Sequence, residues 1–150
     1  MKLRDYTTTS GLLPHLECRD LTDAITQLVQ GLVAAGVVTE ADQLISEIIR
    51  LEQGASTTVG NGLVVPHARF SSVRRLQIAA ATLTQPLEIP TVDDWPVDII
   101  LLLVGPPHEP RQMLRLLARL ARLVKNQSFL EGLRQAQTPA EMAAAFPDME

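Results

Sequence analysis

The chain has 150 residues, a length typical of one domain, and a formal net charge of -4. Hydrophobic residues make up 46% of it but aromatic residues only 3%, so the core must be aliphatic and binding of nucleic acid by base stacking is disfavoured. The acidic balance also argues against nucleic acid and anionic lipid as partners. The single cysteine, Cys18, excludes an internal disulfide and fits the reducing cytoplasm.

Neither a signal peptide nor a membrane span is expected. Residues 1–20 contain no apolar segment of signal-peptide length, and the most apolar run, 97–105, is too short to cross a bilayer. We therefore expect a cytoplasmic protein without direct membrane insertion. No internal repeat or linker divides the chain, so residues 1–150 are expected to form a single domain.

Two amphipathic helices are predicted after residue 19. From Asp20 to Gly36, apolar residues recur at a spacing of three and four, with the aspartate near the start and the glycine as the stop signal. The second helix is expected to begin at Thr39 as N-cap, with Asp42 in the reciprocal capping position, and to end by Gly54.

The middle of the chain has the composition of strands. Segments 57–69, 76–83 and 97–105 are short, aliphatic and bounded by Gly or Pro, and the last two are apolar at nearly every position. Continuous apolarity predicts strands that are buried on both faces. The proline-rich segment 84–98 is expected to form an edge strand and a loop.

Three helices are predicted to close the chain. Residues 111–126 alternate aliphatic residues with arginines at helical spacing, and 127–136 and 138–147 form shorter helices. The last of these begins with Thr138 as N-cap, Pro139 in the first helical position and Glu141 completing a capping box. The predicted fold is therefore α/β, a single domain with a mixed central β-sheet flanked by helices on both faces.

His67 is the residue on which a functional interpretation depends. It follows Pro66 at the end of a predicted strand that opens after the turn Gly60-Asn61-Gly62, so it is expected at the rim of the sheet. Composition and spacing leave two roles open: a half-buried histidine that donates to a backbone carbonyl, or a reactive histidine.

Other chemistries lack their motifs. The chain has no Gly-x-Ser-x-Gly elbow, no phosphate-binding Gly-x-x-x-x-Gly-Lys loop and no His-Glu-x-x-His helix. His15 and Cys18 have a ligand-like spacing but no second pair accompanies them, so we expect no metal site.

The segment "STTVGNGLVVPHARF", followed by "PLEIPTVDDWPVDIILLLVGPP" and "MLRLLARLARLVKN", resembles the enzyme IIA domains of the bacterial phosphoenolpyruvate-dependent sugar phosphotransferase system, of the fructose/mannitol/nitrogen-regulatory type. That type carries a Ser-Thr-x-x-Gly-x-Gly-x-x-x-Pro-His signature. The residues that reproduce it are Ser56, Thr57, Gly60, Gly62, Pro66 and His67.

The resemblance implies that His67 is the phosphoacceptor. It further implies a histidine phosphocarrier protein as donor, a IIB domain or a regulatory target protein as the next partner, and no metal or nucleotide cofactor. Phosphoryl transfer depends mostly on positioning and on stabilisation of charge. The groups expected to support it are the hydroxyls of Ser56 and Thr57, the backbone N–H groups of Gly60, Asn61 and Gly62, the side chain of Arg69 and, if its loop folds back, His108.

Two positions depart from the family pattern. A second histidine is usual near the start of the helix after the "LLLV" strand, where this chain has Met113, and an arginine is usual where it has Leu51. Both departures remove hydrogen-bond donors. Two functions therefore stay open: a phosphohistidine carrier, or a nitrogen-regulatory type of binding module with weak or no phosphotransfer.

Overall fold

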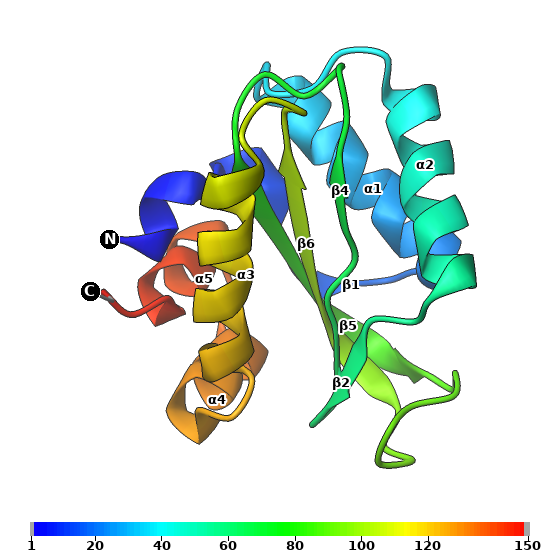
Figure 1. Cartoon of the computed structure of the whole chain (residues 1–150). Helices are drawn as coiled ribbons and strands as arrows, with labels where there is room; N and C mark the ends of the chain where they lie inside the picture. Colours follow the sequence, from blue (N-terminus) through cyan, green and yellow to red (C-terminus); the bar gives the residue numbers. More distant parts are fainter. Residues whose placement is uncertain (1, 149–150) are drawn as a thin grey trace.

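The computed structural model describes residues 2–148 and shows one mixed six-stranded sheet between two groups of helices (Figure 1). The strands are β1 (Leu12–Leu16), β2 (Thr58–Gly60), β3 (Leu63–Val64), β4 (His67–Arg69), β5 (Gln77–Leu87) and β6 (Val97–Gly105). They lie in the order β1-β5-β6-β3-β2, and β4 continues beside β6 after β3. The pairs β5–β6 and β2–β3 are antiparallel, whereas β1 pairs in parallel with β5, and β3 and β4 pair in parallel with β6. The predicted mixed sheet is confirmed.

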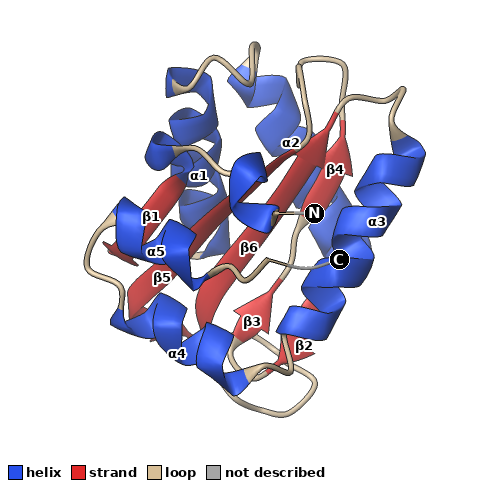
Figure 2. Cartoon of the chain, turned by 90° about the vertical axis from the view of Figure 1, so that its left-hand side faces the viewer, coloured by secondary structure: helices blue, strands red, loops and turns tan. Residues whose placement is uncertain are grey.

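Five α-helices cover the two faces of the sheet (Figure 2). They are α1 (Leu21–Ala34), α2 (Ala41–Gly54), α3 (Pro110–Leu123), α4 (Gln127–Gln135) and α5 (Pro139–Ala145), preceded by two 3-10 helices, η1 (Leu3–Tyr6) and η2 (Thr9–Gly11). Alternate residues of β6 enter the two cores: Leu101 and Leu103 pack with α3, α4 and α5, whereas Ile100 and Leu102 pack with α1 and α2. Burial on both faces explains why β6 and the buried part of β5, up to Leu83, are mostly apolar.

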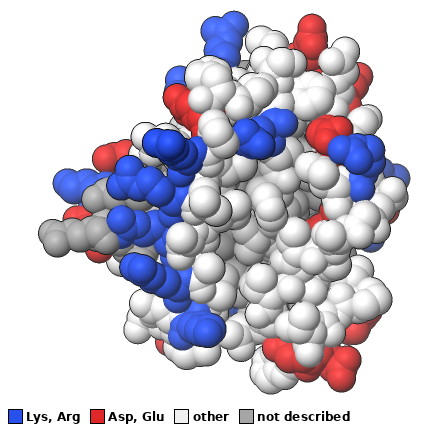
Figure 3. All heavy atoms as spheres, viewed as in Figure 1, with Lys and Arg blue, Asp and Glu red and all other residues white. Residues whose placement is uncertain are grey.

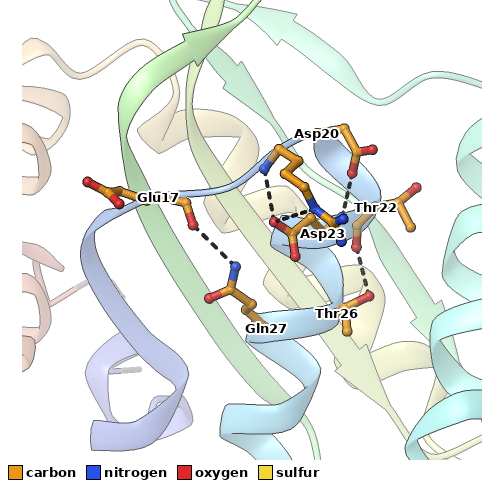
Figure 4. A network of polar contacts seen from close by, with 7 residues as sticks. Glu17, Asp20, Thr22, Asp23, Thr26 and Gln27 are labelled. Atoms are coloured by element: carbon orange, nitrogen blue, oxygen red, sulfur yellow. Dashed lines mark hydrogen bonds and ion pairs between the residues drawn. The ribbon is translucent and has the colours of Figure 1, made fainter.

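The predicted start and stop signals of α1 are confirmed. The Asp20 carboxylate caps the helix by accepting from the backbone N–H of Asp23 at 2.7 Å, and the Asp23 carboxylate accepts from the N–H of Arg19 at 2.9 Å (Figure 4). The helix ends at Ala34, and Gly36 follows with a left-handed φ of 75°. At the other end of the chain, the hydroxyl of Thr138 caps α5 as expected.

Two expectations for the elements were wrong, and one strand was missed. Thr39 is not the N-cap of α2: the helix begins after Glu40, and the N–H and the hydroxyl of Thr39 both donate to the carbonyl of Ser72. The segment after residue 83 does not form a separate edge strand: it extends β5 to Leu87, which pairs with Val97, and the loop follows. Strand β1 was not predicted at all, although it occupies one edge of the sheet beside β5.

Gly31 is required where α1 crosses the 3-10 helix η2. A Cβ at this position would lie against the carbonyl oxygen of Ser10, well inside van der Waals contact. We expect Gly31→Ala to lower the free energy of unfolding by about 1–3 kcal/mol, although alanine is the better helix former. The control is Gly54→Ala, since a Cβ there meets no atom within 4 Å. Urea denaturation should show a lower midpoint than wild type for Gly31→Ala and no decrease in the midpoint for Gly54→Ala.

Candidate functional site

His67 opens the short edge strand β4, which lies between α2 and α3 (Figure 1). The strand pairs with β6 on one side, with His67 opposite Leu103, and the carbonyl of Pro66 accepts from the Leu103 N–H at 3.0 Å. The side chain of His67 is half-buried. His67 therefore lies on a strand at the edge of the sheet, but it begins β4 rather than ending the strand that opens after the glycine turn, which is the separate β3.

One ring nitrogen of His67 has a fixed role. Nδ1 lies 2.9 Å from the carbonyl oxygen of Val65, and a carbonyl can only accept, so Nδ1 carries the proton. In the neutral imidazole the lone pair then resides on Nε2, for which the described residues provide no hydrogen-bond partner. The backbone contact that would suit a purely structural histidine thus also leaves Nε2 as a nucleophile.

His67 lines two neighbouring cavities. The first, of about 440 Å³, lies toward α2 and includes Leu51, Glu52 and Arg69, and the second, of about 340 Å³, lies toward α3. Because side chains alternate along a strand, His67 and Arg69 project from the same face of β4 while the buried Ala68 faces α1 and α2. Arg69 also donates to the carbonyl of Pro107 at 3.1 Å. Of the described residues that line the first cavity, Arg69 alone is cationic.

Ser56 and Thr57 line both cavities together with His67, as expected for the support residues. The hydroxyl of Thr57, however, donates to the carboxylate of Glu52, 2.9 Å from Oε2 and closer still to Oε1, so its proton is already committed. The hydroxyl of Ser56 is exposed, and its two hydrogen bonds, both to Thr58, are long: it donates to the Thr58 hydroxyl at 3.5 Å and accepts from the Thr58 N–H at 3.4 Å. Ser56 is therefore the hydroxyl that remains available to a ligand.

Glu52 is a site residue that the sequence analysis missed. Its two carboxylate oxygens also accept from the backbone N–H of Thr57, each at 3.0 Å, so it holds the chain where it leaves α2 and approaches His67. No spacing rule signals this contact, because a glutamate in the last turn of an amphipathic helix ordinarily points to solvent. The only hint was its position between Leu51 and the Ser-Thr pair.

Removal of this carboxylate should destabilise the fold. We expect Glu52→Ala to lower the free energy of unfolding by about 1–3 kcal/mol, because hydrogen bonds to charged groups contribute that much and the half-buried Thr57 loses its acceptor. Glu52→Gln keeps one acceptor oxygen, so its free energy of unfolding should lie between those of Glu52→Ala and wild type. Glu47→Ala is the control on the same helix, since the partner of Glu47 among residues 2–148 is the exposed Arg50. Equal losses in Glu52→Ala and Glu47→Ala, measured by urea denaturation, would contradict this role.

The turn Gly60-Asn61-Gly62 does not support His67 as expected. All three residues have left-handed φ angles, from 58° to 86°, and join β2 to β3 outside the residues that line the two cavities. The N–H of Asn61 donates instead to the Asp93 carboxylate at 2.9 Å, which lowers the pKa of that carboxyl below its ordinary value. Asn61 further accepts from Arg134 at 2.6 Å. The glycines of the signature therefore shape the hairpin, and through it the approach to β4.

The structure does not bring His108 to the site. Its side chain is 76% exposed and lies in a separate depression at the start of α3. Met113, the position at which a second histidine was sought, does line the first cavity but is buried, with its methyl group against Gly105. Leu51 lines the same cavity and is 39% exposed. Both departures from the family pattern are therefore located at the cavity beside His67.

The described residues contain neither a cluster of metal ligands nor a membrane-spanning helix. Within residues 2–148, no three histidine, cysteine, aspartate or glutamate side chains converge as a metal site would require. Over the same residues, none of the helices combines the length and apolarity needed to span a bilayer.

The chain is similar to proteins of one family. Residues 8–148 match the family described as the phosphoenolpyruvate-dependent sugar phosphotransferase system, EIIA 2. The chain is 31% identical to the 2-O-alpha-mannosyl-D-glycerate-specific EIIABC component of Escherichia coli, matching over 99% of its own length and 23% of that protein. It is 27% identical to a nitrogen regulatory protein of Bradyrhizobium diazoefficiens, over 91% of this chain and 89% of that one.

The fold is also that of a solved relative. The crystal structure of the nitrogen regulatory protein IIA-Ntr from Neisseria meningitidis superposes with a TM-score of 0.85, at 20% identity, over 95% of this chain and 97% of that one. That similarity concerns the fold, and the family match over residues 8–148 shows that the chain belongs to the EIIA 2 family of the phosphoenolpyruvate-dependent sugar phosphotransferase system.

Proposed function

We propose that the chain is a phosphohistidine carrier, that residues 1–150 act as one IIA domain, and that Nε2 of His67 is the atom that accepts phosphate. The observation that carries this proposal is the hydrogen bond from Nδ1 to the carbonyl of Val65 at 2.9 Å. It directs the lone pair to Nε2, on a half-buried side chain that borders two cavities. The neutral imidazole can attack phosphorus without a separate base.

The proposed transfer is an in-line displacement between two imidazoles. The Nε2 lone pair of His67 forms a bond to phosphorus while the phosphorus–nitrogen bond of the donor phosphohistidine breaks, and that electron pair returns to the donor ring. Formation of the bond makes the His67 ring cationic, and the proton stays on Nδ1, which continues to donate its hydrogen bond to the carbonyl of Val65. No metal or nucleotide enters this step.

Charge in the first cavity bears on how well the phosphoryl group is held. Arg69 projects from the same face of β4 as His67 and is the cation we assign to it. The Glu52 carboxylate lines the same cavity, but its oxygens already accept from Thr57. The exposed hydroxyl of Ser56 is a further donor. Arg69 and Ser56 are therefore the donors that remain in this cavity, whereas the donors of the family pattern are missing at Leu51 and Met113.

The donor in this proposal is a histidine phosphocarrier protein, and the acceptor is a IIB domain. The similarity to the E. coli component, whose name EIIABC joins an A part to B and C parts, supports a IIB acceptor. A regulatory function without efficient onward transfer is the second candidate. It is favoured by the match to the Bradyrhizobium nitrogen regulatory protein, which covers 89% of that relative, and by the missing donors at Leu51 and Met113.

Phosphoryl uptake separates these functions. The chain should be incubated with phosphoenolpyruvate, enzyme I and histidine phosphocarrier protein, and its intact mass followed with time. A gain of one acid-labile phosphoryl group supports the carrier, and its loss on addition of a IIB domain supports onward transfer. Uptake without onward transfer supports the regulatory candidate, and an unchanged mass with a verified donor would refute the carrier proposal.

A further inference from the structure

Helix α3 carries an unusual concentration of positive charge. Residues 110–125 include four arginines and one lysine but no acidic residue. At about 100° per residue, Arg111, Arg115 and Arg122 project from one side of the helix, and all three are exposed. We call these three residues the arginine ridge. Figure 3 shows basic side chains gathered in a column over this side of the molecule, where α3 lies.

The ridge lacks carboxylates to neutralise it. None of its three arginines forms an ion pair with another residue of the described part of the chain. Arg111 and Arg115 are four residues apart, a spacing at which like charges destabilise a helix. An exposed helix that serves only to cover the core would gain stability from a glutamate at either position. Repulsion within the ridge therefore destabilises α3, and an anionic partner would relieve this repulsion.

Exposed apolar side chains lie between this ridge and His67. Leu114 is 68% exposed, Ala118 and Ala121 are exposed, and Leu117 is half-buried. We call these four residues the apolar strip. Leu117 and Ala121 also line the second cavity with His67. The strip is thus continuous with the candidate site on one side and with the ridge on the other.

We propose that the arginine ridge and the apolar strip form a docking surface for an acidic protein, one that presents a row of carboxylates beside apolar side chains. This inference goes beyond the carrier function, since it concerns recognition on α3 and needs no phosphate. Carboxylates opposite the ridge would neutralise three unpaired arginines. Apolar groups of the partner would cover the exposed side chain of Leu114 and the rest of the apolar strip beside it.

The charge distribution favours a protein over a nucleic acid or a membrane. Outside residues 110–125 the chain has 8 basic and 17 acidic residues, so the remainder carries a net charge of -9. A long polyanion or an anionic bilayer would extend beyond the ridge and meet that negative charge. A compact acidic patch can match the ridge alone. The apolar strip contains no aromatic residue on which a base could stack.

The test uses a defined probe, a labelled amphipathic helical peptide with glutamates at every fourth position along one side and leucines beside them. Fluorescence anisotropy should show binding to the full chain, and a peptide with glutamine in place of glutamate should bind about tenfold or more weakly. Arg115→Glu combined with Arg122→Glu should weaken binding of the acidic peptide to a similar extent. Leu114→Gln should weaken binding of both peptides.

Arg19→Glu combined with Arg74→Glu is the matched control, because it changes the net charge equally at exposed arginines outside α3. It should leave peptide binding within about twofold of wild type. The ridge variant should melt no lower than wild type, since a carboxylate at 115 lies one turn from Arg111. Peptide binding that is absent, or equally weakened by both variants, would overturn the proposal. It would also be overturned if a DNA duplex or phosphatidylglycerol vesicles bound more tightly than the peptide and lost that binding in the ridge variant.

Discussion

Replacement of His67 by alanine is expected to abolish phosphoryl uptake. The substitution removes Nε2, the ring nitrogen left with the lone pair when Nδ1 donates to Val65, and no other histidine borders the two cavities among residues 2–148. Intact mass after incubation with phosphoenolpyruvate, enzyme I and histidine phosphocarrier protein should therefore show only the unmodified chain. Wild type should gain one phosphoryl group under the same conditions.

Three companion variants make this result specific. His67→Gln keeps a side-chain donor for the Val65 carbonyl but lacks a nucleophilic nitrogen, so it should also take up no phosphate. His15→Ala and His108→Ala remove exposed histidines outside the cavities and should take it up normally. If the His67→Ala protein carried acid-labile phosphate and circular dichroism showed a native fold, the acceptor would be a residue other than His67.

The fold could be predicted from sequence wherever local patterns and tertiary packing agree. Continuous apolarity identified β6 because that strand is covered on both faces, and capping residues placed the starts of α1 and α5. Thr39 was misjudged because its N–H and its hydroxyl both donate to the carbonyl of Ser72, a residue 33 positions away, which no local rule can anticipate. Strand β1 was missed because it contains a proline and a histidine with a left-handed φ of 52°.

The candidate site was predictable only in part. The signature led to His67, and the pleat of β4 accounts for Arg69 beside it. Sequence gave no measure of how far the turn at Gly60-Asn61-Gly62 lies from the imidazole, because the hairpin that separates them is a tertiary feature. Glu52 escaped notice for the same reason. A motif specifies which residues recur together, whereas its glycines can serve the backbone at some distance from the reacting atom.

Restoring a cation at position 51 is expected to produce the largest gain in phosphotransfer. Leu51 lines the cavity beside His67 and is 39% exposed, so an arginine can place its guanidinium there while its stem covers the apolar wall. A hydrogen bond to a charged group contributes about 1.5–3 kcal/mol, which corresponds to roughly tenfold to a hundredfold in rate if it forms only in the transition state. Val33→Arg, at a residue of α1 that is 41% exposed, is the matched control and should leave the rate unchanged.

Restoring the family's histidine at position 113 should have a different effect from restoring its arginine at position 51. Met113 is only 5% exposed and its methyl group packs against Gly105, so Met113→His introduces a polar ring into a largely apolar position. We expect this variant to lose stability in urea denaturation and to gain less in rate than Leu51→Arg. Single-turnover transfer from phosphorylated histidine phosphocarrier protein, measured for wild type, each variant and the double variant, separates the two effects. If wild type already transfers as fast as a relative with both donors, and neither substitution raises the rate, then Arg69 and Ser56 suffice to stabilise the transferring phosphoryl group. In that case the loss of histidine and arginine from the family pattern has been fully compensated within the same cavity.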